Sequence, residues 1–504
     1  MPADATPNAI PATPTAASRA EMRGVFLRAF PSIVLPMFLA SVDQTIVATA
    51  LPNMAGSLGD VERISWVVVA YLMATTIAAP VYGRLGDVFG RKRLLVFALV
   101  LFILASLGCA LAPTMLLLIG ARVLQGCGGG GLMTLSQALV GEIVPPRERP
   151  RYQGYMASVF MCSSTVGPVL GGYLTQHFGW ASVFTINLPL GLLAIVLALR
   201  LQTRAPTGSG FRFDFLGLGL LAGFVIPLLL ALERLQQISL TGLPVAIGLI
   251  VFAAASLWLL LKQERRSASP LIPVKVLRDP SIWRADAMGA CVGAMIVGGV
   301  TFMPIYLQVV RGADPAHVGL MMLPLTAGIA IGSLSTGRLI SRTGRTAIFP
   351  SIGQIVVAAA WSFLAIAADS IPFAWLPAVF AVISLFTGTT MPVVQMTVQI
   401  VAGRSNLGAA SASVQFMRSI GAALGTAVIG AVLFAVLSAR DTKMAALFAD
   451  VVERGPQVLD QVAPAVRTAL AQEITGAFRG AFLAIACFSL IAMGLAWTLP
   501  MRRL

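Results

Sequence analysis

The sequence is dominated by a series of about fourteen apolar stretches, each long enough to cross a lipid bilayer as a helix. A spanning helix needs roughly 20 predominantly apolar residues, since its backbone polar groups must be satisfied internally. With 57% hydrophobic and 11% charged residues, this chain of 504 residues has too little polar surface for a water-soluble globule. We therefore predict an all-α integral membrane protein with spans at residues 30–51, 64–84, 93–112, 115–140, 155–176, 180–199, 214–233, 243–261, 285–308, 318–340, 346–367, 373–397, 409–438 and 479–499.

The positive charges, which give a net charge of +15, are divided unevenly between the two sides of the predicted membrane. With the N-terminus placed inside, 25 of the 35 Lys and Arg residues fall in inside segments and 8 in outside segments. This bias is the positive-inside pattern of membrane proteins, and it predicts that both termini are cytoplasmic. The basicity is thereby explained without nucleic acid, which we do not expect as a partner.

The five cysteines all fall within predicted spans and form no CxxC pair, so we expect neither disulfides nor a cysteine-held metal. The N-terminal segment is rich in Ala, Pro and Thr and lacks the basic-then-apolar order of a signal peptide. We expect residues 1–28 to form a disordered cytoplasmic tail.

A short basic bend occurs twice, as GRLGDVFGRKRLL at residues 83–95 and as GRLISRTGRTAIF at residues 337–349. The first copy joins the second and third predicted spans, and the second copy joins the tenth and eleventh. Two similar halves of six helices, with two helices inserted between them, account for this spacing, and transporters are often built from such repeats. The expected units are residues 29–200, an insertion at 201–270, and residues 271–504 with a long outside segment at 439–478. We expect that segment to be a solvated or interfacial helical hairpin.

The bend has a chemistry that a simple positive-inside loop does not explain. Its glycines permit close helix packing and a tight turn. Asp87 lies among basic residues and can bond to Arg91 or to a helix N-terminus. An ion pair that forms in only one conformation would bias a two-state machine. The candidate switch residues are Gly83, Asp87, Gly90, Arg91, Arg338 and Arg345, although Ser341 stands in the second copy where the first has Asp87.

Asp43 lies well inside the first span, where a charge is expensive enough to be treated as functional. A carboxyl there can bind and release a proton as its surroundings open to each side in turn, and a neutral structural Asp is the alternative. Arg122 of the fourth span is the natural electrostatic partner. Because Arg122 is only some two turns into its span, snorkelling to the outer surface is the alternative for this side chain.

Several motifs in order along the chain resemble those of one family. GRLGDVFGRK is similar to the cytoplasmic loop signature of the major facilitator superfamily. SVDQTIVATALP (residues 41–52), RVLQGCGGGG (122–131), GPVLGGYL (167–174) and INLPLG (186–191) resemble signatures of its fourteen-helix drug:proton antiporters. The resemblance covers nearly all of the chain. It implies two six-helix bundles plus two inserted central helices, fourteen transmembrane helices in all.

The resemblance also implies roles for particular residues. It associates the fourth-span arginine, here Arg122, with proton coupling, together with Asp43. It associates GPVLGG with antiport, so that Gly167, Pro168, Gly171 and Gly172 form a candidate hinge or seal; close packing without function is the alternative. Polar, aromatic and Met positions inside spans are candidates for a substrate cavity, with lipid-facing packing as the alternative for the apolar ones: Gln44, Gln125, Phe160, Asn187, Phe302, Met303, Met391 and Arg418. Asp214, Glu233 and Asp286 lie near predicted span ends, where interface solvation is expected.

The energy source follows from what the sequence lacks. A phosphate-binding P-loop needs Gly before its Lys, whereas the four lysines follow Arg, Leu, Val and Thr. HExxH and GxSxG motifs are also absent, so we expect neither an enzyme nor a cofactor or metal, and a proton gradient remains. The expected function is proton-coupled efflux of amphiphilic drugs or toxic small molecules across a bacterial cytoplasmic (inner) membrane. A metabolite exporter or exchanger and a non-transporting sensor are the alternatives, and a periplasmic adaptor is a possible partner. A single deep carboxylate beside two deep arginines predicts a preference for neutral, zwitterionic or monovalent amphiphiles.

Overall fold

The computed structural model describes residues 16–60, 63–202, 212–236, 242–267, 269–367, 370–441, 444–445, 447–448 and 464–503. Within these ranges the chain is helical, and its one extended pairing is an isolated bridge between Arg345 and Arg503. Among the described residues, fourteen helical segments are long and apolar enough to cross a membrane, as expected.

The N-terminal half consists of α1 (Ala16–Leu58), α2 (Trp66–Phe89), α3 (Arg91–Ala110), α4 (Met115–Ile143), α5 (Arg149–Phe178) and the broken pair α6 (Ser182–Thr185) and α7 (Asn187–Leu199). Two inserted helices follow, α8 (Phe215–Gln236) and α9 (Leu243–Arg266). The C-terminal half contains α10 (Val274–Leu277), α11 (Pro280–Ile305) with η2 (Tyr306–Val310), α12 (Pro315–Thr343), α13 (Ile348–Ala367), η3 (Phe373–Trp375), α14 (Leu376–Thr387), α15 (Thr390–Ala402), η4 (Arg404–Asn406), α16 (Leu407–Arg440) and α18 (Pro464–Trp497).

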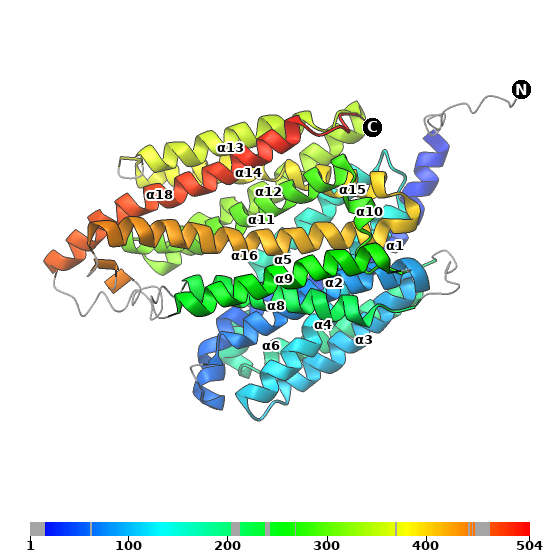
Figure 1. Cartoon of the computed structure of the whole chain (residues 1–504), viewed down its shortest axis with the longest axis horizontal. Coiled ribbons are helices and arrows are strands. Elements are labelled where there is room, and N and C mark those ends of the chain that lie inside the picture. The colour runs from blue at the N-terminus through cyan, green and yellow to red at the C-terminus, as the bar shows by residue number, and fades with distance from the viewer. Residues whose placement is uncertain are drawn as a thin grey trace, which may run out of the picture.

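Each half packs around buried apolar clusters of its own. The core of the N-terminal half includes Leu99, Phe102 and Leu139, and the core of the C-terminal half includes Trp361, Phe380 and Phe482. The inserted helices pack on each other and on α2 and α16, with Leu221, Val225 and Leu260 buried beside Ile77 and Phe416. Figure 1 shows α8 and α9 beside α16. The insertion therefore covers one line of contact between the halves.

Two expected boundaries differ from the structure. Helix α1 begins at Ala16, so the second part of the tail expected at residues 1–28 is helical, whereas residues 1–15 lie outside the described residues. Residues 16–28 contain Ala, Arg, Glu, Met and Leu, which favour helix and extend the first span.

At the other end of the chain, α16 continues to Arg440 and α18 begins at Pro464, inside the outside segment expected at 439–478. Arg440 of α16 and Glu473 of α18 form an ion pair at 3.4 Å, so the ends of these helices lie together. The first and last described parts of the segment thus prolong the last two spans, and between them Ala445 and Phe448 are buried in the core of the C-terminal half, not solvated. Residues 449–463 lie outside the described part of the chain.

Candidate functional site

The two repeated bends lie where α2 turns into α3 at Gly90 and where α12 turns into α13 at Gly344. Both glycines have positive φ angles, 93° and 69°, which an L side chain rarely adopts. The end of the bundle that carries Gly90, Gly344 and Arg404 is called the basic end below, and the opposite end the far end.

The halves touch at the basic end along two similar contacts. At the first, Gly83 of α2 faces Gly408 of α16, and a Cβ on Gly83 would lie 2.6 Å from the Gly408 carbonyl oxygen. At the second, Gly337 of α12 lies against the Pro150 backbone of α5. The first glycine of each repeated bend is therefore a point of close backbone approach between halves.

Asp87 connects the halves by accepting hydrogen bonds across the first contact. Its carboxylate receives the backbone N–H groups of Gly408 at 2.8 Å and of Ala409 at 3.0 Å, in the first turn of α16. It also receives Arg91 at 2.6 Å. The sequence predicted bonding to Arg91 or to a helix N-terminus, and the structure contains both. An anion at a helix N-terminus is favoured by the unpaired N–H groups and the helix dipole.

Arg91 extends this cluster. It pairs with Glu142 of α4 at 2.5 Å and donates to the Arg404 carbonyl of the other half at 3.3 Å. Sequence reasoning missed Glu142, since one acid at the end of a predicted span resembles an ordinary interfacial residue. The acid conforms to no motif that the sequence analysis used.

The second bend has no equivalent cluster in the described part of the chain. Ser341 bonds only to the Arg338 carbonyl of its own helix. Arg338 and Arg345 are exposed and form no ion pair within the described residues. Thr346 donates to the Met501 carbonyl, which ties this bend to the end of its own half. The Arg338 side chain donates to the Tyr155 hydroxyl of α5, in the other half, so a switch role for the two arginines remains a prediction.

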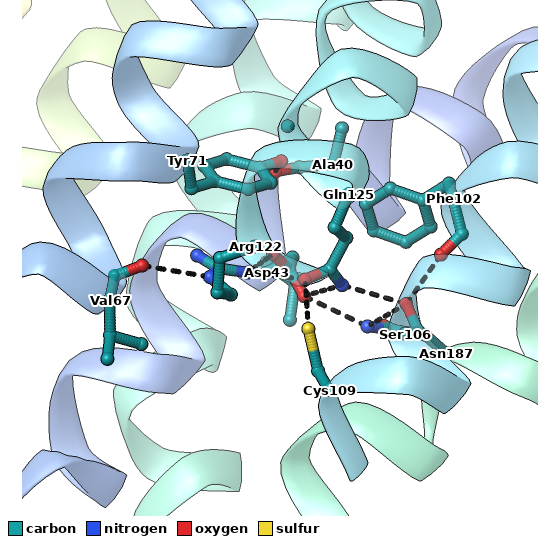
Figure 2. A network of polar contacts seen from close by, with 12 residues as sticks. Ala40, Asp43, Val67, Tyr71, Phe102, Ser106, Cys109, Arg122, Gln125 and Asn187 are labelled. Atoms are coloured by element: carbon teal, nitrogen blue, oxygen red, sulfur yellow. Dashed lines mark hydrogen bonds and ion pairs between the residues drawn. The ribbon is translucent and has the colours of Figure 1, made fainter. Parts of the chain in front are cut away.

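Asp43 lies in a fully buried polar network between α1, α2, α3, α4 and α7, shown in Figure 2. Its carboxylate accepts from Arg122 at 2.5 Å, from Gln125 at 2.8 Å and from Asn187 at 2.9 Å. Ser106 accepts from the Gln125 and Asn187 amides and donates to the Phe102 carbonyl. The carboxylate is thereby satisfied without water.

Arg122 has no exposed surface, so the alternative of snorkelling to the outer surface is wrong. Its Nε donates to the Val67 carbonyl at 3.0 Å, and its guanidinium lies 4.1 Å above the Tyr71 ring centroid. Its second terminal nitrogen is buried without a hydrogen-bond partner. A buried cation with a free donor and one carboxylate partner can change partners when that carboxylate is neutralised.

Gln125 and Asn187, expected in a substrate cavity, belong to this network instead. Gln125 is fully buried and Asn187 is 2% exposed, and both amides face Asp43. The sequence placed them within spans but not on a helix face. The sequence feature that could have identified Asn187 is its position in INLPLG, where it is an amide in an otherwise apolar span.

The antiporter-like motif of α5 packs on α1 next to Asp43. Added Cβ atoms on Gly167 and Gly171 would collide with Thr45, Ile46 and Thr49. Pro168 is exposed within a continuous α5, and nothing lies within 4 Å of where a Gly172 Cβ would point. Two of the four motif residues therefore set the α1–α5 distance, and the hinge role remains a prediction.

A cavity of about 350 Å³ runs along the contact between the halves and is called the seam cavity. It brings together Gln44, Phe160, Met391 and Arg418, as the sequence predicted, and Glu233 also lines it. The Arg418 guanidinium lies 4.6 Å from the Phe160 ring centroid and donates to Gln415 at 2.6 Å.

Phe302 and Met303, also expected in this cavity, lie in the core of the C-terminal half, 7% and 1% exposed. Apolar side chains suit a cavity wall and a core equally, so their type could not decide between the two.

Asp286 and Asp214 are buried, 5% and 8% exposed, which contradicts the interface solvation expected of both. Helix α11 begins at Pro280, and six residues make almost two turns, so Asp286 is deeper than expected. Asp214 accepts from the Gly217 N–H at 2.7 Å at the start of α8 and from the Gln263 amide.

Comparisons with known proteins agree with this architecture. Residues 33–426 match the sequence profile of the Major Facilitator Superfamily. The multidrug transporter protein MdtP of Bacillus subtilis is 30% identical over 404 residues, which are 80% of this chain and 74% of that protein. An uncharacterized MFS-type transporter of Mycobacterium tuberculosis is 34% identical over 411 residues, 82% of this chain, but the chain spans only 60% of that relative's length.

Among solved structures, the proton:xylose symporter XylE is similar with a TM-score of 0.61 at 14% identity, covering 96% of each chain. The human organic anion transporter MFSD10 also gives a TM-score of 0.61 at 14% identity, covering 94% of this chain and 99% of that one. At such identity the likeness concerns the fold alone.

Proposed function

We propose that this chain, which belongs to the Major Facilitator Superfamily, exports amphiphilic drugs or other toxic small molecules across the cytoplasmic membrane of a bacterium in exchange for protons. The observation that carries the proposal is the fully buried Asp43 carboxylate, held by Arg122, Gln125 and Asn187. Relatives named as multidrug transporters and efflux pumps support the export of drugs.

The basic end faces the cytoplasm in this proposal, because the excess of Lys and Arg falls on that side. With Gly83 against Gly408 and Asp87 on the start of α16, the described conformation is closed toward the cytoplasm. Alternating access then requires these contacts to part while the far end closes.

Proton binding at Asp43 provides the coupling. Neutralising the carboxyl leaves Arg122 as a buried cation without its anion, which costs about 3–5 kcal/mol unless the cation finds new partners. The Gln125 carbonyl oxygen already accepts from Arg122 at 2.7 Å, and the Tyr71 ring lies beneath the guanidinium. The rearrangement changes how α1 is held to α4. Helix α1 packs on α5 through Gly167 and Gly171, and α5 touches Gly337 of the other half at Pro150. A shift of α1 can therefore reach the contact between the halves through α5.

The seam cavity is the proposed cargo site. Its walls are mostly apolar, and its charged lining residues are Arg418 and Glu233 on different helices. One cation and one anion in an apolar cavity complement neutral, zwitterionic or monovalent amphiphiles. Aromatic cargo can stack where Phe160 and Arg418 already face each other.

The test is transport by purified protein in sealed proteoliposomes with an imposed pH gradient. Wild-type protein moves cargo against its gradient and carries protons the opposite way, whereas Asp43→Asn folds normally and carries neither above empty vesicles. Asp214→Asn is the matched control, since it neutralises a buried acid outside the network and leaves transport unchanged. Wild-type rates in Asp43→Asn would remove Asp43 from the mechanism.

A drug-sensitivity panel in an efflux-deficient bacterial host identifies the cargo range. Protection against several unrelated amphiphiles is the expected result. If the protein protects the host against none of these compounds, and one cell metabolite drives proton movement in proteoliposomes, the function would be export of that metabolite and not of drugs.

A further inference from the structure

Besides Asp214, two more buried acids lie outside the network and the seam cavity. Glu264 of α9 is 4% exposed and Asp286 of α11 is 5% exposed. Both line one cavity of about 260 Å³, called the carboxyl cavity below, between the inserted helices and the C-terminal half. Its other walls are apolar, and include Leu260, Phe416 and Met417.

The protein satisfies these carboxyls only in part. The Ile272 N–H donates to one Glu264 oxygen at 3.2 Å, and the other Glu264 oxygen is buried without a hydrogen-bond partner. Asp286 receives a single hydroxyl, from Ser413 at 3.2 Å. Neither acid forms an ion pair within the described residues. An unpartnered carboxylate oxygen in an apolar cavity is costly unless the group binds a proton or a cationic ligand satisfies it.

The residues around the carboxyl cavity suit a ligand that enters it from the membrane. Trp283 lines the carboxyl cavity and is 45% exposed. Trp258 is also exposed and lies on α9, less than two helical turns before Glu264. Tryptophan is enriched at the membrane–water interface, where amphiphilic molecules gather with their charge toward water.

The exposed basic residues Lys262 and Arg265 lie outside the lining, where salt screens their effect. Arg84 of α2 is also outside the lining but acts electrostatically on Glu264, so a bound cation shares that carboxyl with it.

The geometry points to a binding site for a monovalent organic cation with an apolar body, held by Glu264 and Asp286 in the carboxyl cavity. The apolar walls receive the body, and the two carboxyls receive the charge. This site is distinct from the seam cavity, whose lining includes Arg418. Its meaning rests on the proposed export function, for which it would be a point of entry from the inner side of the membrane.

Binding can be measured without transport, using wild-type protein in lipid nanodiscs and radiolabelled tetraphenylphosphonium. We expect saturable binding that Glu264→Gln and Asp286→Asn each weaken about tenfold, as for the loss of one charge-assisted contact. Glu473→Gln, which removes an exposed acid paired with Arg440 away from this cavity, should bind as the wild type does. Tetraphenylborate, an anion of the same shape, should not compete.

Carbodiimide labelling provides a second readout that does not depend on variants. Dicyclohexylcarbodiimide adds to buried carboxyls, and mass spectrometry locates the adduct. Tetraphenylphosphonium should protect Glu264 and Asp286 and leave the labelling of Asp43 unchanged. Equal binding by wild type and the Glu264→Gln/Asp286→Asn double variant, or protection by tetraphenylborate as well, would overturn the site. If tetraphenylphosphonium binds as expected but neither the wild type nor any variant transports cargo, the export function would be overturned and the site would stand.

Discussion

Removing the Asp87 carboxylate should open the basic end. The carboxylate receives two backbone N–H groups of α16, from Gly408 and Ala409, and both bonds cross between the halves. Its pair with Arg91 stays within one half and therefore does not contribute to closure. Replacing a capping Asp by Ala costs about 0.5–2 kcal/mol. A value near 2 kcal/mol, reasonable for a side chain that is 2% exposed, shifts the equilibrium about 30-fold toward the open basic end.

Spin labels on the two halves measure this shift. Arg93 on α3 and Arg342 on α12 are exposed at the basic end, and the labels replace them through cysteine in a background lacking Cys127, Cys162 and Cys487. If one wild-type molecule in a hundred is open, about a quarter of Asp87→Ala molecules should show a longer distance by pulsed electron resonance.

Two further variants make the measurement decisive. Asp87→Asn keeps one acceptor oxygen and should fall between the wild type and Asp87→Ala. Asp60→Ala removes an exposed pair with Arg63 and should leave the distances unchanged. An Asp87→Ala protein with the wild-type distance distribution would refute the inference that this cap holds the halves together.

Two more substitutions test the packing and the network. Gly408→Val places atoms against the Gly83 backbone and Asp87, so the same spin labels should report an open basic end and transport should be lost; Gly172→Val, which meets nothing within 4 Å, should change neither. Arg122→Lys keeps the charge, but one ammonium cannot replace the separate guanidinium bonds to Asp43, Gln125 and the Val67 carbonyl. We expect helical content by circular dichroism to be retained and proton-coupled flux in proteoliposomes to be lost, and wild-type flux would contradict this.

The fold was largely readable from the sequence because a bilayer imposes a length and a composition on each span. The repeated bend then located the two inserted helices. The boundaries were harder to predict, since a helix such as α18, which begins at Pro464, extends beyond its apolar run. Asp43 and Arg122 could be identified from the sequence because charged residues are rare within apolar spans.

What the sequence left open was the direction in which side chains point. A helix that is apolar all round has no distinct core face, so hydropathy does not fix its rotation. All four residues Gln125, Asn187, Phe302 and Met303 were therefore predicted to line the cavity. In the structure, Gln125 and Asn187 face Asp43. Phe302 and Met303 lie in the core of the C-terminal half. The Glu264 carboxyl was missed because a span-end acid is ordinary until packing covers it.

The two bends share their glycines and arginines but not the acid Asp87, and this difference affects how the halves separate. Gly83 and Gly337 each permit close approach, so both contacts can form and part by packing alone. Among the described residues, the contact of α2 with α16 carries a carboxylate cap, through Asp87, whereas Ser341 bonds within its own helix. The contact of α12 with α5 has a hydrogen bond from Arg338 to Tyr155 instead. The inserted helices α8 and α9 cover the contact of α2 with α16, which places the carboxyl cavity beside a contact that must open.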